Sequence, residues 1–204
     1  LQPDVQQPDA AVQLPPLPRL TYLKLYIQPQ ALVHLQLAQL PALAELGLFG
    51  SGGRAALLIS GPAPQVQGLS CSLEQLWVDF SALPGFKRAC LAATMELDQA
   101  ASIAAATALT SVVLQLWEPG GEYGSALDML ENLPPAVKCL ELMGTWPAAA
   151  AELVGELQGL AALYLDCSEG EEAPVPPAGA PLWTSLRSFS WDSALNETAL
   201  PQVW

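Results

Sequence analysis

The chain has 204 residues, 51% of them hydrophobic and 13% charged, and its 20 acidic against 7 basic residues give a net charge of −13. This composition excludes an intrinsically disordered chain, because so much apolar surface must be buried. The bases are few and scattered along the sequence, which argues against nucleic acid or an anionic membrane surface as a partner. No stretch has the length and apolarity of a transmembrane helix, so we expect no membrane insertion.

Cysteine and histidine content limits the chemistry further. The four cysteines are Cys71, Cys90, Cys139 and Cys167, which are widely spaced and form no C-x-x-C pair. This pattern favours free thiols in a reducing compartment, so a cytoplasmic location is the expectation, with two disulfides as the alternative. Because His34 is the single histidine, we expect neither a zinc site nor another cofactor.

In chain order, residues 1–16 are predicted to form an irregular N-terminal arm or part of a repeat unit. Over residues 17–204, the pattern L-x-x-L-x-L (with Val or Phe replacing some leucines) recurs at intervals of 23 to 36 residues. The segments begin at Leu20, Leu43, Leu73, Leu109, Val137, Leu160 and Leu186. This period predicts a solenoid of about seven units, each a strand followed by a returning segment. Since the chain starts at Leu1 and shows no obvious capping unit at its end, we expect a fragment of a longer protein.

Hydroxyl side chains recur at the ninth position of four of these segments. They are Ser51, Ser81, Thr145 and Ser168, and each can hydrogen-bond to backbone groups of neighbouring turns. With these residues, the segments resemble leucine-rich repeats, in which the ninth position is usually Asn or Cys. Gln28, Trp117 and Ala194 depart from that pattern. The resemblance implies an α/β solenoid with a parallel concave sheet and with helices and loops on the convex side.

The returning segments carry their own signals. Helices are predicted over Pro29–Leu40, Phe86–Ala106, Tyr123–Leu133 and Pro147–Leu157, the last with Thr145 as a candidate cap. The stretch from Gly50 to Gly68 has too many glycines and prolines for a long helix.

Residues between the leucines of each strand point to the opposite side and would cover the concave face. Large aromatic and acidic residues are frequent among them, and aromatic residues are the usual anchors of protein interfaces. The predicted partner-binding residues are Tyr22, Tyr26, Phe49, Trp77, Asp79, Glu141, Met143, Tyr164 and Asp166. Trp77, Glu141 and Tyr164 are predicted to occupy the same offset in their repeats.

These features predict a non-catalytic module that binds another protein through its concave face. By analogy with leucine-rich repeats that follow an F-box, it is a candidate for the recognition part of a larger receptor or adaptor. The first alternative is a structural subunit held permanently in a large complex. An enzyme such as a hydrolase is the remaining alternative, and it would require His34 beside a nucleophile in a deep pocket.

Overall fold

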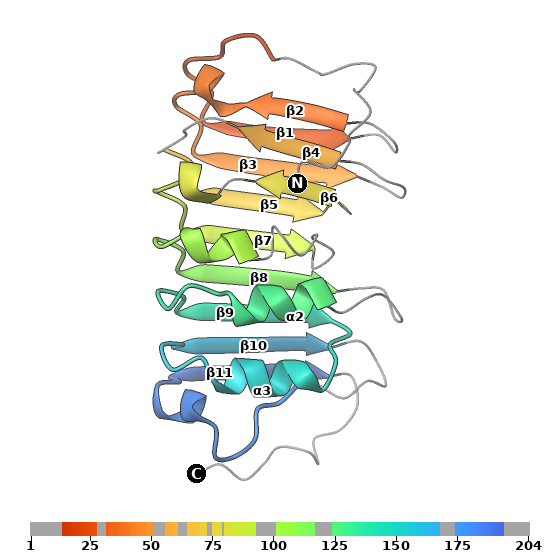
Figure 1. Ribbon diagram of the computed structural model, residues 1–204, viewed down its shortest axis with the longest axis vertical. Helices are drawn as coiled ribbons and strands as arrows, with labels where there is room; N and C mark the ends of the chain where they lie inside the picture. The colour runs from red at the N-terminus through yellow and green to blue at the C-terminus, as the bar shows by residue number, and fades with distance from the viewer. Residues whose placement is uncertain are drawn as a thin grey trace.

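The computed structural model describes residues 14–27, 32–50, 56–60, 65–72, 75–78, 80–92, 101–116, 124–167 and 174–193. In this part of the chain, eight strands form one parallel sheet in the order β1-β3-β5-β7-β8-β9-β10-β11 (Figure 1). These strands are β1 (Tyr22–Ile27), β3 (Glu45–Gly50), β5 (Gly68–Ser72), β7 (Arg88–Ala92), β8 (Ser111–Leu116), β9 (Cys139–Gly144), β10 (Ala162–Cys167) and β11 (Ser188–Ser193). The chain is therefore an α/β protein whose described strands stack in chain order.

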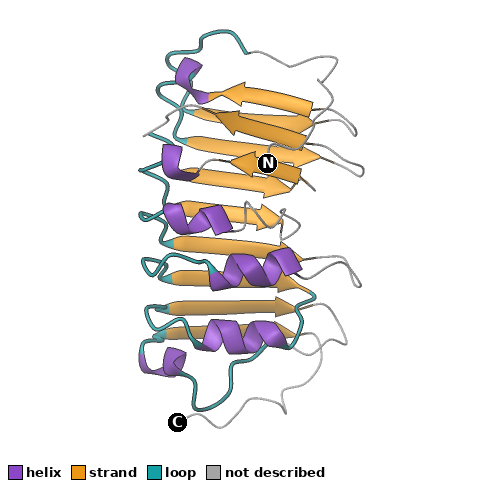
Figure 2. Ribbon diagram, viewed as in Figure 1, coloured by secondary structure: helices purple, strands orange, loops and turns teal. Residues whose placement is uncertain are grey.

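A second layer covers one face of this sheet, and its character changes along the stack (Figure 2). Three parallel strands, β2 (Leu32–Gln36), β4 (Ala56–Ser60) and β6 (Gln75–Val78), cover the first strands on the side nearer the viewer in Figure 1 and point the opposite way. Helices α2 (Gly124–Glu131) and α3 (Ala149–Gly155) cover the last strands on the same side, and we call these returning segments the rear layer. Short 3-10 helices occupy Leu37–Gln39 (η1), Phe80–Ala82 (η2), Ala101–Ala105 (η3) and Pro181–Thr184 (η4).

Every step from one strand of the large sheet to the next uses the same pair of backbone hydrogen bonds. The carbonyl of the residue before a strand accepts the N–H groups of two consecutive residues in the next unit, at 2.8 to 3.1 Å. The accepting carbonyls belong to Thr21, Ala44, Gln67, Lys87, Thr110, Lys138 and Ala161. Register partners lie 20 to 28 residues apart in sequence, for example Gly68 with Arg88 and Ser111 with Cys139. The backbone therefore repeats one local geometry through the whole described stack.

The core lies between the two layers. Side chains alternate along the strands, so that in β9 Leu140 and Leu142 are fully buried while their neighbours are partly exposed. Before several strands, buried residues recur every third position, as in Leu37, Leu40 and Leu43. There the backbone makes successive i to i−3 hydrogen bonds, from Leu40 to Leu37 and from Leu43 to Leu40. This tight turn connects the second layer to the start of the next strand of the large sheet.

The third predicted repeat, beginning at Leu73, was assigned to the wrong layer. Residues Gln75–Val78 form β6, which pairs with β4 in the second sheet. The large sheet uses β5 and β7 instead, whose inward residues follow Val66-x-x-Leu69-x-Cys71 and Phe86-x-x-Ala89-x-Leu91. With these strands in place the described units number eight, and the interval between them is more regular than the sequence had indicated.

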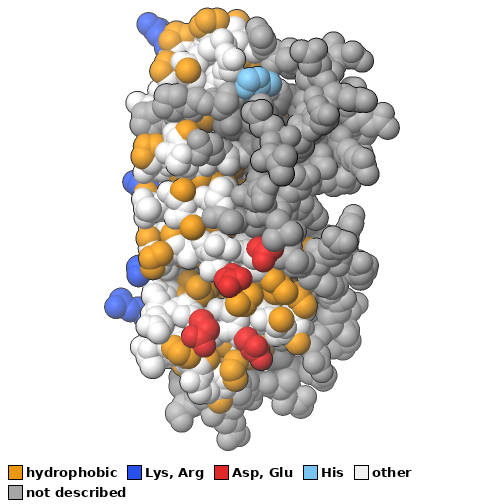
Figure 3. All heavy atoms as spheres, viewed as in Figure 1, with side chains coloured by type: hydrophobic (Ala, Val, Ile, Leu, Met, Phe, Trp, Pro, Cys, Tyr) orange, Lys and Arg blue, Asp and Glu red, His pale blue; other side chains and the backbone are white. Residues whose placement is uncertain are grey.

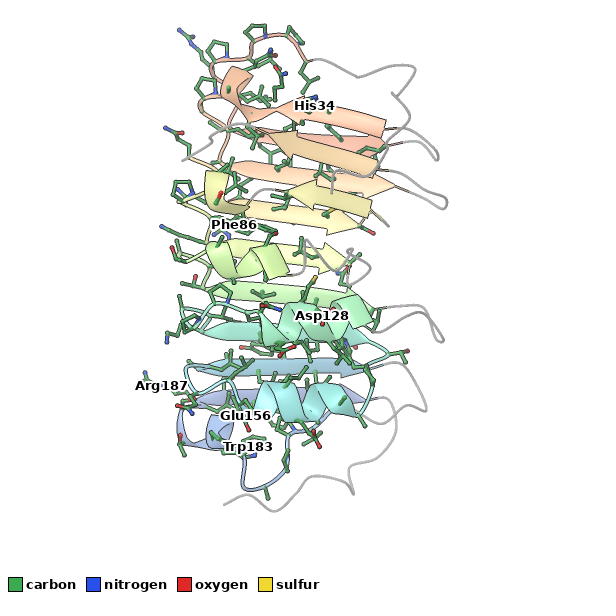
Figure 4. All side chains as sticks on the ribbon, viewed as in Figure 1. His34, Phe86, Asp128, Glu156, Trp183 and Arg187 are labelled. Carbon is green, nitrogen blue, oxygen red and sulfur yellow. The ribbon has the colours of Figure 1, made fainter. Side chains whose placement is uncertain are left out.

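Two of the four predicted helices are confirmed. Helices α2 and α3 lie within Tyr123–Leu133 and Pro147–Leu157, although Ala148, with no side-chain cap bond, stands at the start of α3 in place of Thr145. The other two predictions were wrong. Pro29–Leu40 contains β2 and η1, so His34 lies on a strand, half-buried beside Leu14 and Gln39 (Figure 4). Phe86–Ala106 contains β7 and η3, with residues 93–100 outside the described part.

Candidate binding face

One face of the eight-stranded sheet is turned away from the second layer, and we call it the open face. On it stand Tyr22, Lys24 and Tyr26 of β1 and the residues in register with them on the following strands. Among the described residues, the large hydrophobic side chains classed as exposed are Tyr22 (56%), Tyr26 (74%) and Tyr164 (37%). All three belong to this face, because they alternate with the buried core residues of their strands.

The first end of the open face carries an aromatic cluster, which we define as Tyr22, Lys24, Tyr26 and Phe49. The Tyr26 and Phe49 rings are neighbours in register, with their centroids 5.8 Å apart. The Lys24 ammonium lies 5.0 Å from the centroid of Tyr26 and 4.6 Å from that of Phe49, within the range of a cation–π contact. A hydrogen bond with Tyr26 raises the pKa of Lys24 above its ordinary value.

Two glycines allow the side chains of this end to lie flat on the sheet. A Cβ on Gly47 would stand 3.0 Å from Cε2 of Phe49 and 3.6 Å from Cγ of Lys24. A Cβ on Gly68 would clash with the carboxylate of Glu45. The missing side chains therefore leave the space over which the aromatic cluster and Glu45 extend.

The side chain of Glu45, on β3, extends over Gly68 of β5 toward β7. Its carboxylate accepts a hydrogen bond from the guanidinium of Arg88 and forms an ion pair with it across β5. The two side chains are 38% and 61% exposed, so the pair contributes little to stability. Its effect is geometric: it fixes a paired acid and base beside the aromatic cluster.

The other end of the open face is less aromatic. Glu141 is in register with Tyr164, and Met143 with Asp166. The amide of Gln115 donates to the sulfur of Met143 at 3.6 Å. All of these except Tyr164 are half-buried, so this end presents one exposed aromatic ring among partly covered polar side chains.

A cysteine lies near the middle of the same face. Burial raises the pKa of the Cys90 thiol, and the negative charge of Glu141 adds to the effect. Both changes favour the neutral thiol. Cys90 and Cys139 form no disulfide, and the side chain of Cys167 lies outside the described part.

The structure brings seven of the nine predicted binding residues to one face: Tyr22, Tyr26, Phe49, Glu141, Met143, Tyr164 and Asp166. The prediction that Trp77 shares an offset with Glu141 and Tyr164 was wrong, because Trp77 pairs with Leu58 in the second sheet. Its neighbour Asp79 lies outside the described residues.

The predicted hydroxyl ladder is not assembled by the described residues. Ser51 and Ser168 lie outside them. Ser81 lies in η2, after a strand of the second sheet, and therefore not at the predicted place. Thr145 does follow a strand of the large sheet, and its backbone N–H donates to the carbonyl of Leu116 at 2.7 Å.

Sequence reasoning missed the residues that β5 and β7 contribute to the face, Gly68, Arg88 and Cys90. The signal was present in the spacing of Val66, Leu69 and Cys71 and again in that of Phe86, Ala89 and Leu91. It was overlooked because Cys and Ala take the places of leucine.

Within the described part of the chain, no group of three or more His, Cys, Asp and Glu side chains is arranged to hold a metal ion. The helices of that part are all too short or too polar to cross a membrane. Compared with known proteins, the chain matches no family model, no curated protein and no solved structure.

Proposed function

We propose that this chain is a leucine-rich-repeat solenoid that binds another protein through its open face and has no catalytic role. The repeat assignment is supported by the seven successive strand steps that share one pair of backbone bonds. It is also supported by the core columns, which are dominated by leucine in strand after strand. Within this proposal, the module serves as the recognition part of a larger receptor or adaptor.

The observation that carries the proposal is the placement of the exposed aromatic residues. Tyr22, Tyr26 and Tyr164 are the exposed large hydrophobic residues of the described part, and they share one face. Single exposed aromatics need no explanation, whereas these share one face, and Tyr22 and Tyr26 form a cluster there with Phe49, which favours an interface. Tyrosine is also suited to anchoring a partner, because it combines a large apolar ring with a polar tip and few rotatable bonds.

A photo-crosslinking experiment tests this proposal. A benzophenone side chain would replace Tyr26 on the open face or, as a matched control, the exposed Glu152 on helix α3 of the rear layer. In native extract, we expect a discrete cross-linked species from position 26 that is weak or absent from position 152. Adding excess unlabelled wild-type chain should suppress it, whereas excess chain carrying Tyr22→Ala and Tyr26→Ala should not. Cross-links predominantly from position 152, or from neither position, would contradict the proposal.

A permanent structural subunit is the second candidate, and the ends of the stack favour it. Leu23 and Leu25 of β1 and Phe189 of β11 are only half-buried, whereas Leu46 and Leu48 of β3, in register with the first two, are almost fully buried. A neighbouring subunit that covers these ends would bury more apolar surface. The two candidates separate in the same cross-linking samples after a high-salt wash: a subunit retains its partners in fixed ratio, and a recognition module loses them.

A further inference from the structure

Three bases of the described part lie along one edge of the large sheet. Lys87, Lys138 and Arg187 each directly precede a strand of the large sheet, β7, β9 and β11, and all three are exposed. Figure 3 shows Lys and Arg side chains along the edge where the front strands begin and acidic side chains over the rear layer. Figure 4 places Arg187 at that edge, with its side chain directed outward. We call these three residues the basic row.

The register gives the basic row a regular spacing. The three residues occupy equivalent places, because the backbone N–H of each donates to the carbonyl of the residue that precedes the neighbouring strand. One strand separates consecutive members, and adjacent strands lie about 4.8 Å apart, so the members lie about 10 Å apart. The intervening units place Thr110 and Ala161 there, which are too short to cover the charges.

The basic row has no acidic counterpart among the described residues. No ion pair joins Lys87, Lys138 or Arg187 to a described carboxylate, whereas Arg88, the residue after Lys87, is paired with Glu45 on the open face. The ammonium of Lys138 donates to the carbonyl of Gly159 at 3.1 Å, and a Cβ on Gly159 would stand 3.2 Å from that nitrogen. This base is therefore positioned by a carbonyl, with its charge unneutralised and donors left for a ligand.

We propose that the basic row is a docking edge for an extended acidic segment of a partner protein. An extended chain in the polyproline II conformation rises about 3.1 Å per residue with three residues per turn, so carboxylates at every third position lie on one side, about every 9 Å, and match the row. The net charge of −13 does not prevent this, because at physiological salt charges farther than about 8 Å are largely screened. The occupant is a short segment, since three bases match three carboxylates and not the dense charge of a nucleic acid.

Because exposed ion pairs are weak, the test uses a method that detects weak binding, at the physiological ionic strength that screens the net negative charge of the chain. The isotope-labelled full chain is titrated with a peptide that has Asp at every third position and neutral residues between. The control peptide has the same composition with its Asp residues adjacent. We expect amide shifts at Lys87, Lys138 and Arg187 that saturate at lower concentration with the spaced peptide and disappear in high salt. No shifts at this edge, or equal titrations by the two peptides, would overturn the inference.

Two charge-matched variants localise the effect. Lys138→Gln with Arg187→Gln should weaken binding of the spaced peptide about threefold to tenfold, in line with two exposed ion pairs. Arg19→Gln with Arg54→Gln removes the same charge outside both the basic row and the aromatic cluster and should change binding less than about twofold. A larger loss in this second variant would place the peptide away from the row and refute it. That outcome would leave the protein-binding proposal for the aromatic cluster standing, so the two proposals fail separately.

A parallel titration decides the class of partner. A single-stranded oligonucleotide of the same total charge, and vesicles containing anionic lipid, replace the peptide. We expect both to shift the resonances of the basic row less than the spaced peptide does at equal charge. Stronger shifts with either would overturn the assignment to an acidic polypeptide.

Discussion

The first and last parts of the described stack share the same strand geometry in the large sheet but differ in the layer that covers it. Between β1 and β3 the register advances by 23 residues and the chain returns through a strand, β2. Between β9 and β10 it also advances by 23 residues, yet the chain returns through a helix, α3. Length therefore does not decide the form of the return. Composition does: LVHLQ has the branched and alternating character of a strand, and AAAELVG is rich in the best helix former.

The backbone of the large sheet is the same beside strand returns and beside helical returns. The ladder of paired hydrogen bonds continues across the change from strand to helix without interruption. A stack of strands in chain order can tolerate this, because each returning segment needs only to cover the core at its own strand and to contact the adjacent returning segment. The second sheet, β2-β4-β6, and the contact of α2 with α3 are two solutions to that requirement.

The largest expected effect tests whether a core leucine of the large sheet contributes the same stability where strands cover the sheet and where helices cover it. Leu48 of β3 and Leu142 of β9 hold the same place in their units, and both are fully buried. Replacing either by Ala should lower the free energy of unfolding by about 3–5 kcal/mol, because a large cavity remains in each. Urea denaturation followed by circular dichroism measures both.

The half-buried Leu25 of β1, in register with Leu48, is the control for that pair. Leu25→Ala should cost about 1–2 kcal/mol, because less apolar surface is removed from the core. If Leu48→Ala cost less than half as much as Leu142→Ala, the strand-backed core would be looser than the helix-backed one, and the front would not be uniform.

The exit from β9 toward its helical return should show the next effect. Among the described glycines, only Gly144 has a positive φ, of 90°. Gly144→Ala forces a Cβ into that conformation and should destabilise the protein by about 1–2 kcal/mol. Thermal unfolding of the variant measures the loss.

Gly50 ends β3 at the equivalent place before a strand return, and it has no positive φ. Gly50→Ala should therefore change stability by less than about 0.5 kcal/mol. Gly179→Ala, where a Cβ meets no heavy atom within 4 Å, provides a second control. Equal losses at Gly144 and Gly50 would mean that the left-handed turn is not specific to the helical return.

The sequence predicted the front strands where leucine marks the core and failed where smaller residues replace it. β1, β3, β8, β9, β10 and β11 were located correctly. β5 and β7 were missed because Cys71 and Ala89 hold places that a search for leucine ignores. In β7 the Ala-rich composition also favoured a helix, and pairing with β5 and β8 overrides that local preference.

The rear layer was harder to predict for a related reason. The run from Leu32 to Leu40 has apolar residues at spacings that suit either a strand or a helix. The pairing of β2 with β4 decides between them, and that contact joins residues 24 apart in sequence, as Leu32 with Ala56. The binding face was predicted only as far as its strands were. Tyr22, Tyr26 and Phe49 lie on β1 and β3, which were located correctly, whereas Arg88 lies on β7, which was missed.

A smaller effect is expected for the ion pair on the open face. A double-mutant cycle with Glu45→Gln and Arg88→Gln should give a coupling free energy below about 1 kcal/mol, because both side chains are substantially exposed. The coupling should fall further as salt is raised. A coupling well above that value would show that the pair is shielded from water, and that this part of the face is more rigid than its exposure indicates.

The smallest effects are titrations that distinguish the first end of the open face from its middle. The pKa of Lys24 is raised chiefly by its bond with Tyr26, whereas that of Cys90 is raised chiefly by burial. Removing a neighbour should therefore matter more for Lys24. Thiol alkylation rates against pH should show that Glu141→Gln lowers the pKa of Cys90 only in part, since burial remains.

For Lys24 the sign follows from the raised pKa in the folded state. Any stabilisation from its charge is fully present below the unfolded pKa of about 10.5 and is lost as pH rises through the higher folded value. Tyr26→Phe removes the hydrogen bond and should lower the pKa of Lys24 toward 10.5, as followed by NMR of its side-chain methylene next to the ammonium. Tyr22→Phe should produce a smaller change, because Tyr22 acts only through its charge and is the weakest contributor. If Tyr22→Phe lowered the pKa more, the ammonium would lie nearer Tyr22 than the Tyr26 and Phe49 rings, and the aromatic cluster would need a different geometry.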